Sequence, residues 1–202
     1  MTNLPDPLVD VDAELVEALR RDSPDATEQL VERFGDRVYR LARRITGSKR
    51  DAEEATQDAL STAVRKIGTF DGEAAFGRWL SRIASNAAYE KLHARRRKAG
   101  EVVLDDVLPA FDGDGRHFER MADWSERVDE RALTAGLLEV LERAIDELPP
   151  DYRTALVMHD VEGLSSSDVA ETLGINRTAA KSHVHRSRLR VRKQLEEYLQ
   201  PR

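Results

Sequence analysis

Several features that would indicate other classes of protein are missing from this sequence. It has no cysteine, which excludes a disulfide framework and a thiolate metal site. No apolar run is long enough for a transmembrane helix, and the N-terminus lacks the charged, apolar and small-residue succession of a signal peptide. We therefore expect a cytoplasmic protein with no direct insertion into a membrane.

Patterns that indicate catalysis are missing as well. The sequence has no glycine-rich phosphate loop and no serine or cysteine nucleophile motif, and its five histidines are scattered. His183 and His185 would diverge by about 200° on a helix, so they cannot share a metal ion as an i, i+4 pair could. We predict no catalytic residue, metal, cofactor or small-molecule substrate. A hydrolase using Asp and His is the alternative, which metal-dependent turnover in an activity screen would support.

Helical periodicity is what the sequence does contain. Between Leu30 and Ile45 apolar residues recur three or four positions apart, after a predicted N-cap at Ser23, and Gly47 is expected to end this helix. Similar spacing and end signals predict further helices over residues 48–67, 76–98, 133–148 and 151–161. No strand alternation of useful length occurs, so the predicted fold class is all-α.

The charge of the chain is distributed in blocks. The net charge is −6, yet residues 76–98 carry seven basic and one acidic side chain, and residues 174–202 carry eight and two. Each of these blocks therefore has a net charge of +6 inside an acidic chain. Cationic blocks attract phosphates locally, while acidic surroundings discourage indiscriminate binding. Two separate basic blocks indicate two contacts with nucleic acid.

The second basic block coincides with a helix-turn-helix pattern. Ser165 and Asp168 fit a Ser-x-x-Asp capping box, Gly174 fits a left-handed helix end, and Asn176 is a good N-cap for a second helix. One side of that second helix is small and apolar and should pack on the first; it carries Ala180, Val184, Ser187 and Val191.

The adjoining arc of the second helix is then free to enter a major groove of duplex DNA. It carries Thr178, Lys181, Ser182, His185 and Arg186. Arg188, Arg190, Arg192 and Lys193 extend the positive charge. A solvated basic helix is the alternative. The cap, the glycine turn and the small-residue face occur together, which favours DNA binding.

The order of these helices resembles the sigma-70 family of bacterial transcription initiation factors, specifically its extracytoplasmic-function (ECF) group. Four blocks carry the resemblance: residues 37–47, 51–58, 70–86 and 148–153, the last leading into the helix-turn-helix. It implies an N-terminal extension (1–23), sigma region 2 (24–98), a flexible acidic linker (99–136) and sigma region 4 (137–198). Ser166 and Ser167 depart from the family, which often has an aromatic and an acidic residue there.

The resemblance implies a protein without catalytic activity that binds core RNA polymerase, directs it to promoter DNA, and is restrained by an anti-sigma factor. It assigns minus-35 contacts to Arg177, Thr178, Lys181, Ser182, His185 and Arg186. It assigns minus-10 contacts to Asp71, Glu73, Ala74, Phe76, Arg78, Arg82, Asn86 and Lys91. It assigns core polymerase contacts to Asp51, Glu54, Gln57 and Asp58.

Some of these assignments have plainer alternatives. Asn86 can offer a donor and an acceptor to a base edge, but it can equally be a helix-surface asparagine. Trp79 lies on the same stripe as Phe76 and is predicted to pack in the core. The acidic residues of the linker, Asp105, Asp106, Asp112 and Asp114, are hypothesised to stand in for RNA phosphates. For the whole chain, a stand-alone helix-turn-helix regulator is the alternative to a polymerase subunit.

Overall fold

The computed structural model describes residues 7–72, 75–99 and 132–199, with side chains from residue 12 in the first range and from residue 136 in the last. Its elements are all helical, and the described residues include no strand. The predicted all-α fold class is therefore confirmed. Within these ranges, no helix combines the length and apolar character of a membrane span.

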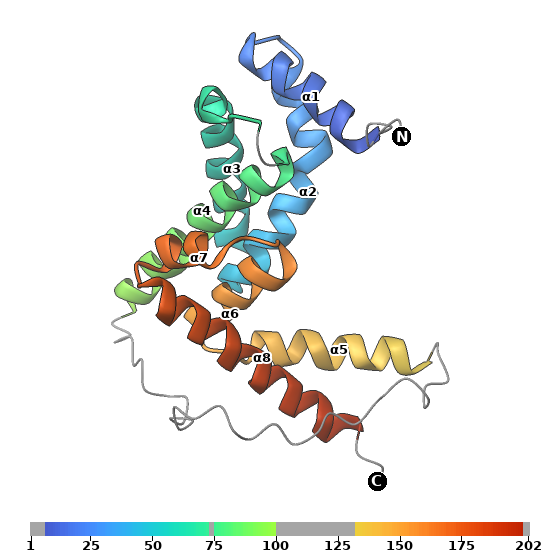
Figure 1. Ribbon diagram of the computed structural model, residues 1–202, viewed down its shortest axis with the longest axis vertical. Coiled ribbons are helices and arrows are strands. Elements are labelled where there is room, and N and C mark those ends of the chain that lie inside the picture. Colours follow the sequence, from blue (N-terminus) through green and yellow to red (C-terminus); the bar gives the residue numbers. More distant parts are fainter. Residues whose placement is uncertain (1–6, 73–74, 100–131, 200–202) are drawn as a thin grey trace, which may run out of the picture.

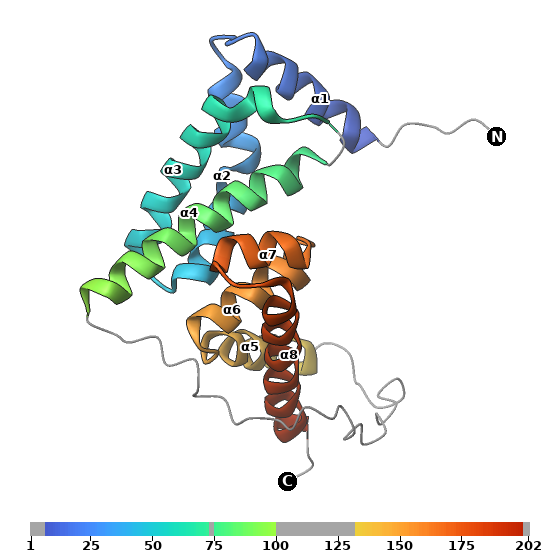
Figure 2. The same cartoon turned by 60° about the vertical axis from the view of Figure 1, so that its left-hand side comes forward.

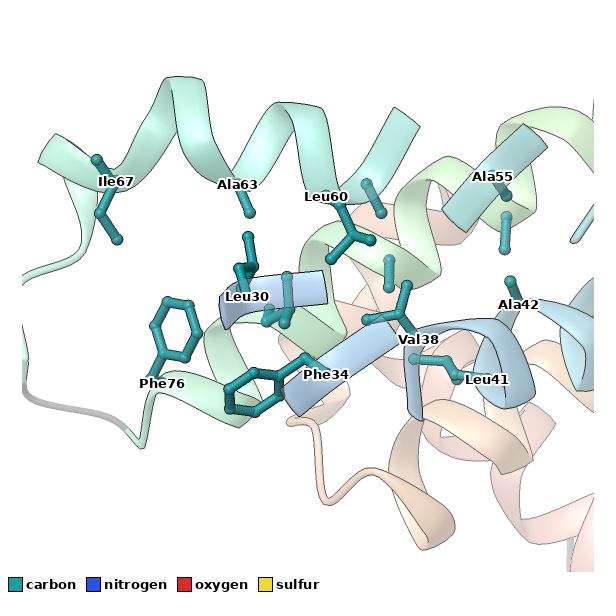
Figure 3. Close-up of a cluster of buried hydrophobic side chains, with 14 of the residues drawn as sticks. Leu30, Phe34, Val38, Leu41, Ala42, Ala55, Leu60, Ala63, Ile67 and Phe76 are labelled. Carbon is teal, nitrogen blue, oxygen red and sulfur yellow. The ribbon is translucent and has the colours of Figure 1, made fainter. Parts of the chain in front are cut away.

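The first helical unit contains α1 (Pro7–Arg20), α2 (Ala26–Thr46), α3 (Lys49–Lys66), the short 3₁₀ helix η1 (Ile67–Thr69) and α4 (Phe76–Lys98). In Figure 1 these helices form the upper part of the molecule. Helices α2, α3 and α4 pack on one another around a shared core, in which α3 contributes mostly alanines, as Figure 3 shows. Small side chains on α3 allow its backbone to approach its neighbours closely.

The helix ends of this unit follow local rules. Gly47 adopts a left-handed conformation (φ 66°), and its N–H donates to the carbonyl of Arg43. The Ser48 hydroxyl accepts the N–H of Asp51 and caps α3. Both ends agree with the sequence prediction. The N-cap of α2 differs: it is Asp25 and not Ser23, because Ser23 belongs to the turn that closes α1, where its N–H donates to the carbonyl of Ala18.

The second helical unit contains α5 (Ala132–Asp146), α6 (Pro150–Leu156), the π-helical turn η2 (Val157–Val161), α7 (Ser166–Leu173) and α8 (Arg177–Leu199). Helices α7 and α8 are the predicted helix-turn-helix. The capping box is present in full, Gly174 is left-handed (φ 67°), and the Asn176 side chain accepts the N–H of Ala179 at 2.8 Å. The predicted inner face of α8 is buried: Ala180, Val184, Ser187 and Val191.

The segment predicted as one helix over residues 151–161 is instead α6 followed by the wider turn η2. Three consecutive residues here enter three different apolar clusters. Leu156 packs with α5 and α8, Val157 enters the core of the first unit, and Met158 enters the core of the helix-turn-helix. Residues 156–158 therefore join the two units through their side chains.

The two units also lie against each other along α4 and α7. Figures 1 and 2 both show α7, in orange, beside the middle of α4, in green. The first helix of the helix-turn-helix thus lies between α8 and the first unit. This arrangement decides which side chains of the first basic block have partners in the second unit.

Candidate nucleic-acid interfaces

The outer face of α8 is open. Arg177, Thr178, Lys181 and His185 are exposed, while Ser182 and Arg186 are half-buried at the edge of the face. Thr178, Lys181, Ser182 and His185 lie on the side of α8 away from its buried residues, whereas Arg177 is the first residue of the helix and Arg186 lies at the edge, beside Tyr152 of α6. The structure thus brings five of the six predicted minus-35 residues together along one face of α8, and places Arg177 at the start of the helix. A single helix has the width that fits a major groove.

Tyr152 of α6 packs against α8 and contacts three of its residues. Its ring stacks on His183, with centroids 4.2 Å apart and planes 20° apart. Its hydroxyl accepts from Arg186 Nη1 at 3.4 Å, and its backbone carbonyl accepts the Ser187 hydroxyl at 2.9 Å. The sequence analysis placed Tyr152 in the family block 148–153 but gave it no contact, because its three partners lie more than thirty residues away along the chain.

The positive charge farther along α8 is partly neutralised. Arg188 donates from Nε and Nη2 to the two carboxylate oxygens of Asp160, at 2.8 and 2.6 Å. These bonds hold the pKa of Asp160 below its ordinary value and raise that of Arg188. Arg192 pairs with Glu196 at 2.6 Å. The expected extension of positive charge is therefore weaker than the sequence suggests.

The outer face of α4 carries the predicted minus-10 residues Arg78, Arg82 and Asn86 at intervals of four, which places them along one side of the helix. Arg78 is exposed. Arg82 and Asn86 lie opposite α7: Arg82 Nη1 is 3.4 Å from Asp168 Oδ1, and the Thr172 hydroxyl donates to the side-chain oxygen of Asn86. Two predicted DNA residues are thus engaged by the helix-turn-helix.

Asp168 has a double role at this contact. It closes the capping box of α7, accepting from the backbone N–H and the hydroxyl of Ser165, and it faces Arg82. Burial alone would raise the pKa of Asp168, but the bonds from Ser165 and the charge of Arg82 outweigh it and leave the pKa below its usual value. The carboxylate is therefore charged at neutral pH and favours the nearby guanidinium.

Further polar contacts join the two units. Glu162, whose side chain is only 7% exposed, accepts from Arg37 Nη2 at 3.0 Å and from the Ser81 hydroxyl at 2.6 Å. Buried Arg153 donates from Nη2 to the carbonyl of Ile45 at 3.0 Å, at the C-terminal end of α2. A cation there is favourable because helix carbonyls point outwards at that end. The sequence analysis predicted none of these contacts between the units.

The remaining predicted minus-10 residues are spread over different environments. Phe76 is buried, with its ring between Phe34 and Phe70 at centroid distances of 5.3 and 5.6 Å, and Figure 3 shows it turned towards the core. Trp79 packs beside it, as predicted. Asp71 is exposed. Glu73, Ala74 and the linker residues Asp105, Asp106, Asp112 and Asp114 lie outside the described residues.

Lys91 turns away from the other minus-10 residues and faces α3. Its Nζ lies 2.8 Å from Asp58 Oδ2 and 3.3 Å from Glu54 Oε2. The bond with Asp58, opposed by partial burial and helped by Glu54, raises the pKa of Lys91. Glu54 also accepts from Arg50 at 3.2 Å, and Arg95 pairs with Asp51. Three of the four predicted polymerase residues are therefore ion-paired within the unit, and Gln57 is exposed.

Comparison with known proteins agrees with this arrangement. Residues 30–98 match the family model of sigma-70 region 2, and residues 138–191 match that of sigma-70, region 4. The first match falls on the unit of α2 to α4, and the second on the unit of α5 to α8. Each unit thus carries one family module and one basic block.

Curated relatives match across both units. The ECF RNA polymerase sigma factor SigM of Mycobacterium tuberculosis is 35% identical over 181 residues, which cover 89% of this chain and 82% of the relative. The ECF sigma factor SigE of Mycolicibacterium smegmatis is 32% identical over 170 residues, covering 82% of this chain. This chain spans 60% of the length of that relative.

A solved structure shares the fold. The sigma factor RpoE, crystallised with the anti-sigma factor NepR from Bartonella quintana, superposes with a TM-score of 0.53 at 23% identity. The match covers 85% of this chain and 98% of that one. With both modules present in order and relatives matching along most of the chain, the protein belongs to the ECF group of the sigma-70 family of RNA polymerase sigma factors.

Proposed function

We propose that this protein is an alternative sigma factor that binds core RNA polymerase in the cytoplasm and directs it to a specific set of promoters. The observation that carries this proposal is that each family module coincides with one helical unit and one basic helix, α4 or α8. Two separated cationic helices suit two promoter elements. The chemistry of transcription then belongs to the polymerase.

The outer face of α8 is the proposed reader of the minus-35 element. Lys181 and Arg186 can reach guanine acceptors in the major groove, while Arg177, Thr178 and Ser182 at the start of the helix suit phosphates. His185 lies on the same exposed face. Because Tyr152 and the α7 packing fix the helix from behind, this face is ordered before DNA arrives, which lowers the entropic cost of binding.

The outer face of α4 is the proposed reader of the minus-10 element, through Asp71, Arg78, Arg82 and Asn86. A flipped base costs a few kcal/mol to unstack, so polar partners such as Asn86 have to compensate. Arg82 and Asn86 contact α7 in this structure, so DNA has to compete with Asp168 and Thr172 for these two side chains. Phe76 is left out of the contact surface because its side chain is buried.

Acidic residues of α3 are the proposed contact with core polymerase. Asp58 and Gln57 are exposed, and Asp51, Glu54 and Asp58 already face basic side chains of α4 and α3. A basic surface on the polymerase would compete with Lys91 and Arg95 for these carboxylates. We also propose control by an anti-sigma factor, because the similarly folded sigma factor RpoE was crystallised in complex with one.

The decisive experiment is transcription on a genomic DNA library, with purified core polymerase and with or without this protein. The proposal predicts start sites that depend on both components and that share two conserved elements. Tight, sequence-specific binding to duplex DNA without core polymerase, combined with no start-site selection, would instead support a stand-alone helix-turn-helix regulator. The same library reveals the promoter consensus.

A further inference from the structure

Helix α1 lies ahead of the region matched by the sigma-70 region 2 model, which begins at residue 30. Its second half nevertheless belongs to the core of the first unit. Leu15, Val16 and Leu19 are buried in the same apolar cluster as α2, α3 and α4. Figure 2 shows α1 lying across the end of the unit where α3 leads into α4.

The last residue of α1 makes a polar contact at that end. Arg20 Nη2 donates to the backbone carbonyl of Phe70 at 2.5 Å. Arg20 Nη1 donates to Glu17 Oε1 at 2.8 Å, one turn earlier on the same helix, which orients the guanidinium. A charged donor makes a stronger bond to a carbonyl than a neutral one does. This contact spans fifty residues of sequence.

Phe70 is where the chain leaves η1 in an extended conformation (φ −77°, ψ 113°) and continues towards Asp71. Its ring is fixed in the core against Phe76 and Trp79, at centroid distances of 5.6 and 5.5 Å. Because a peptide group is planar, holding the carbonyl oxygen of Phe70 also fixes the plane that leads to Asp71. The fixed ring and the held carbonyl together set the direction in which the backbone leaves Phe70 for Asp71.

We infer that Arg20 is a positioning residue for minus-10 selectivity. By holding the Phe70 carbonyl, it fixes the peptide plane that places the proposed minus-10 residue Asp71, although Arg20 lies outside the matched module. This inference rests on the proposed function. It gives α1 a role in promoter choice besides its role in the core.

The test compares holoenzymes containing wild-type protein, Arg20→Ala or Arg20→Lys on a set of promoters. Each promoter differs from the preferred sequence by one base, in either the minus-10 or the minus-35 element. For Arg20→Ala we expect the ratio of rates between preferred and substituted minus-10 elements to fall about tenfold, in line with the loss of one charge-assisted hydrogen bond. The minus-35 ratios should stay unchanged, and Arg20→Lys should restore part of the selectivity.

Arg21→Ala is the matched control, because Arg21 is exposed, is the next residue and donates to a carbonyl of its own helix. It should leave both sets of ratios unchanged. A merely structural role for Arg20 would reduce the active fraction and lower the rates from all promoters by one factor, without changing any ratio. That result, or unchanged minus-10 ratios, would overturn the inference.

Two further measurements distinguish misfolding of Arg20→Ala and failure of the proposed function from failure of this inference. Glu17→Gln keeps Arg20 but weakens its orienting partner, and it should lower the minus-10 ratios by a smaller factor; this variant serves if Arg20→Ala does not fold by circular dichroism. Wild-type holoenzyme that selects no promoter at all would contradict the proposed function itself. That outcome is visible before any variant is compared.

Discussion

The two candidate DNA-binding helices are held in different ways. Helix α8 is packed from behind by its own unit, and its outer face is open. Helix α4 is contacted on part of its outer face by α7, a helix of the other unit, which engages Arg82 and Asn86 and leaves Arg78 exposed. The basic blocks look equivalent in the sequence, since each has a net charge of +6. Their surroundings differ because tertiary packing, and not composition, decides which side chains already have partners in the other unit.

The largest effect on DNA recognition is expected on the open outer face of α8. The double substitution Lys181→Ala with Arg186→Ala should weaken minus-35 recognition by about a hundredfold, because each base-edge contact is worth about 1–3 kcal/mol. Binding of the holoenzyme to duplexes with intact or scrambled minus-35 elements measures this. Lys193→Ala, an exposed cation farther along α8, is the control and should have only a small, salt-dependent effect. Loss of core polymerase binding in the double variant would contradict the assignment.

A smaller effect is expected on the face of α4 that α7 contacts. Glu162→Gln combined with Thr172→Val removes a charge and a hydroxyl from the contact between the units, and should raise affinity for a single-stranded minus-10 oligonucleotide about tenfold. Because the chain has no cysteine, single cysteines at exposed Val31 and Leu138 can carry a fluorophore pair that reports the separation of the units. Glu171→Gln, on the exposed side of α7, is the control. Unchanged energy transfer and oligonucleotide affinity would mean that these contacts do not hold the units together.

Asp58→Asn tests the proposed contact between α3 of the first unit and core polymerase. We expect a roughly fivefold loss of affinity for core polymerase, because a carboxylate facing a basic partner contributes to the orientation and strength of binding. Fluorescence titration of labelled protein with core polymerase measures it. Glu53→Gln, an exposed neighbour on α3, should leave the affinity unchanged. Equal losses in both variants would indicate general electrostatics rather than a specific contact.

The smallest effect is expected at Tyr152, which supports α8 from its inner side. Tyr152→Phe removes the hydroxyl that accepts from Arg186 but keeps the ring stacked on His183. Affinity for the minus-35 duplex should fall about threefold, as expected for one neutral acceptor. Tyr198→Phe, the same change near the exposed far end of α8, should have no effect. A loss of thermal stability without a loss of affinity would show that Tyr152 only supports packing.

The features that could be predicted from the sequence depend on residues within one turn of a helix. The Ser165 capping box, the left-handed Gly174, the Asn176 cap and the buried side of α8 all follow from spacings of three or four residues. The prediction of Ser23 as the N-cap of α2 is wrong because Ser23 belongs to the turn that ends α1, where its N–H donates to the carbonyl of Ala18. Local rules do not contain that information.

The state of the candidate site could be predicted only in part. The open arc of α8 followed from helical periodicity. The engagement of Arg82 and Asn86 by α7, and of Lys91 by α3, joins residues that are 37 to 86 positions apart. Such pairs arise when whole helices pack, so no pattern near Arg82 or Lys91 could indicate that their charges were already paired.

The π-helical turn at Val157–Val161 has a consequence for how the two modules can evolve. An α-helix rotates by about 100° per residue, and a wider turn by somewhat less. An insertion or deletion of one residue here would therefore rotate everything that follows by roughly that angle. Leu156, Val157 and Met158 could then no longer reach their three separate clusters. Loops elsewhere can absorb changes in length, whereas the uninterrupted spacing of Leu156, Val157 and Met158 fixes the rotation of one module relative to the other.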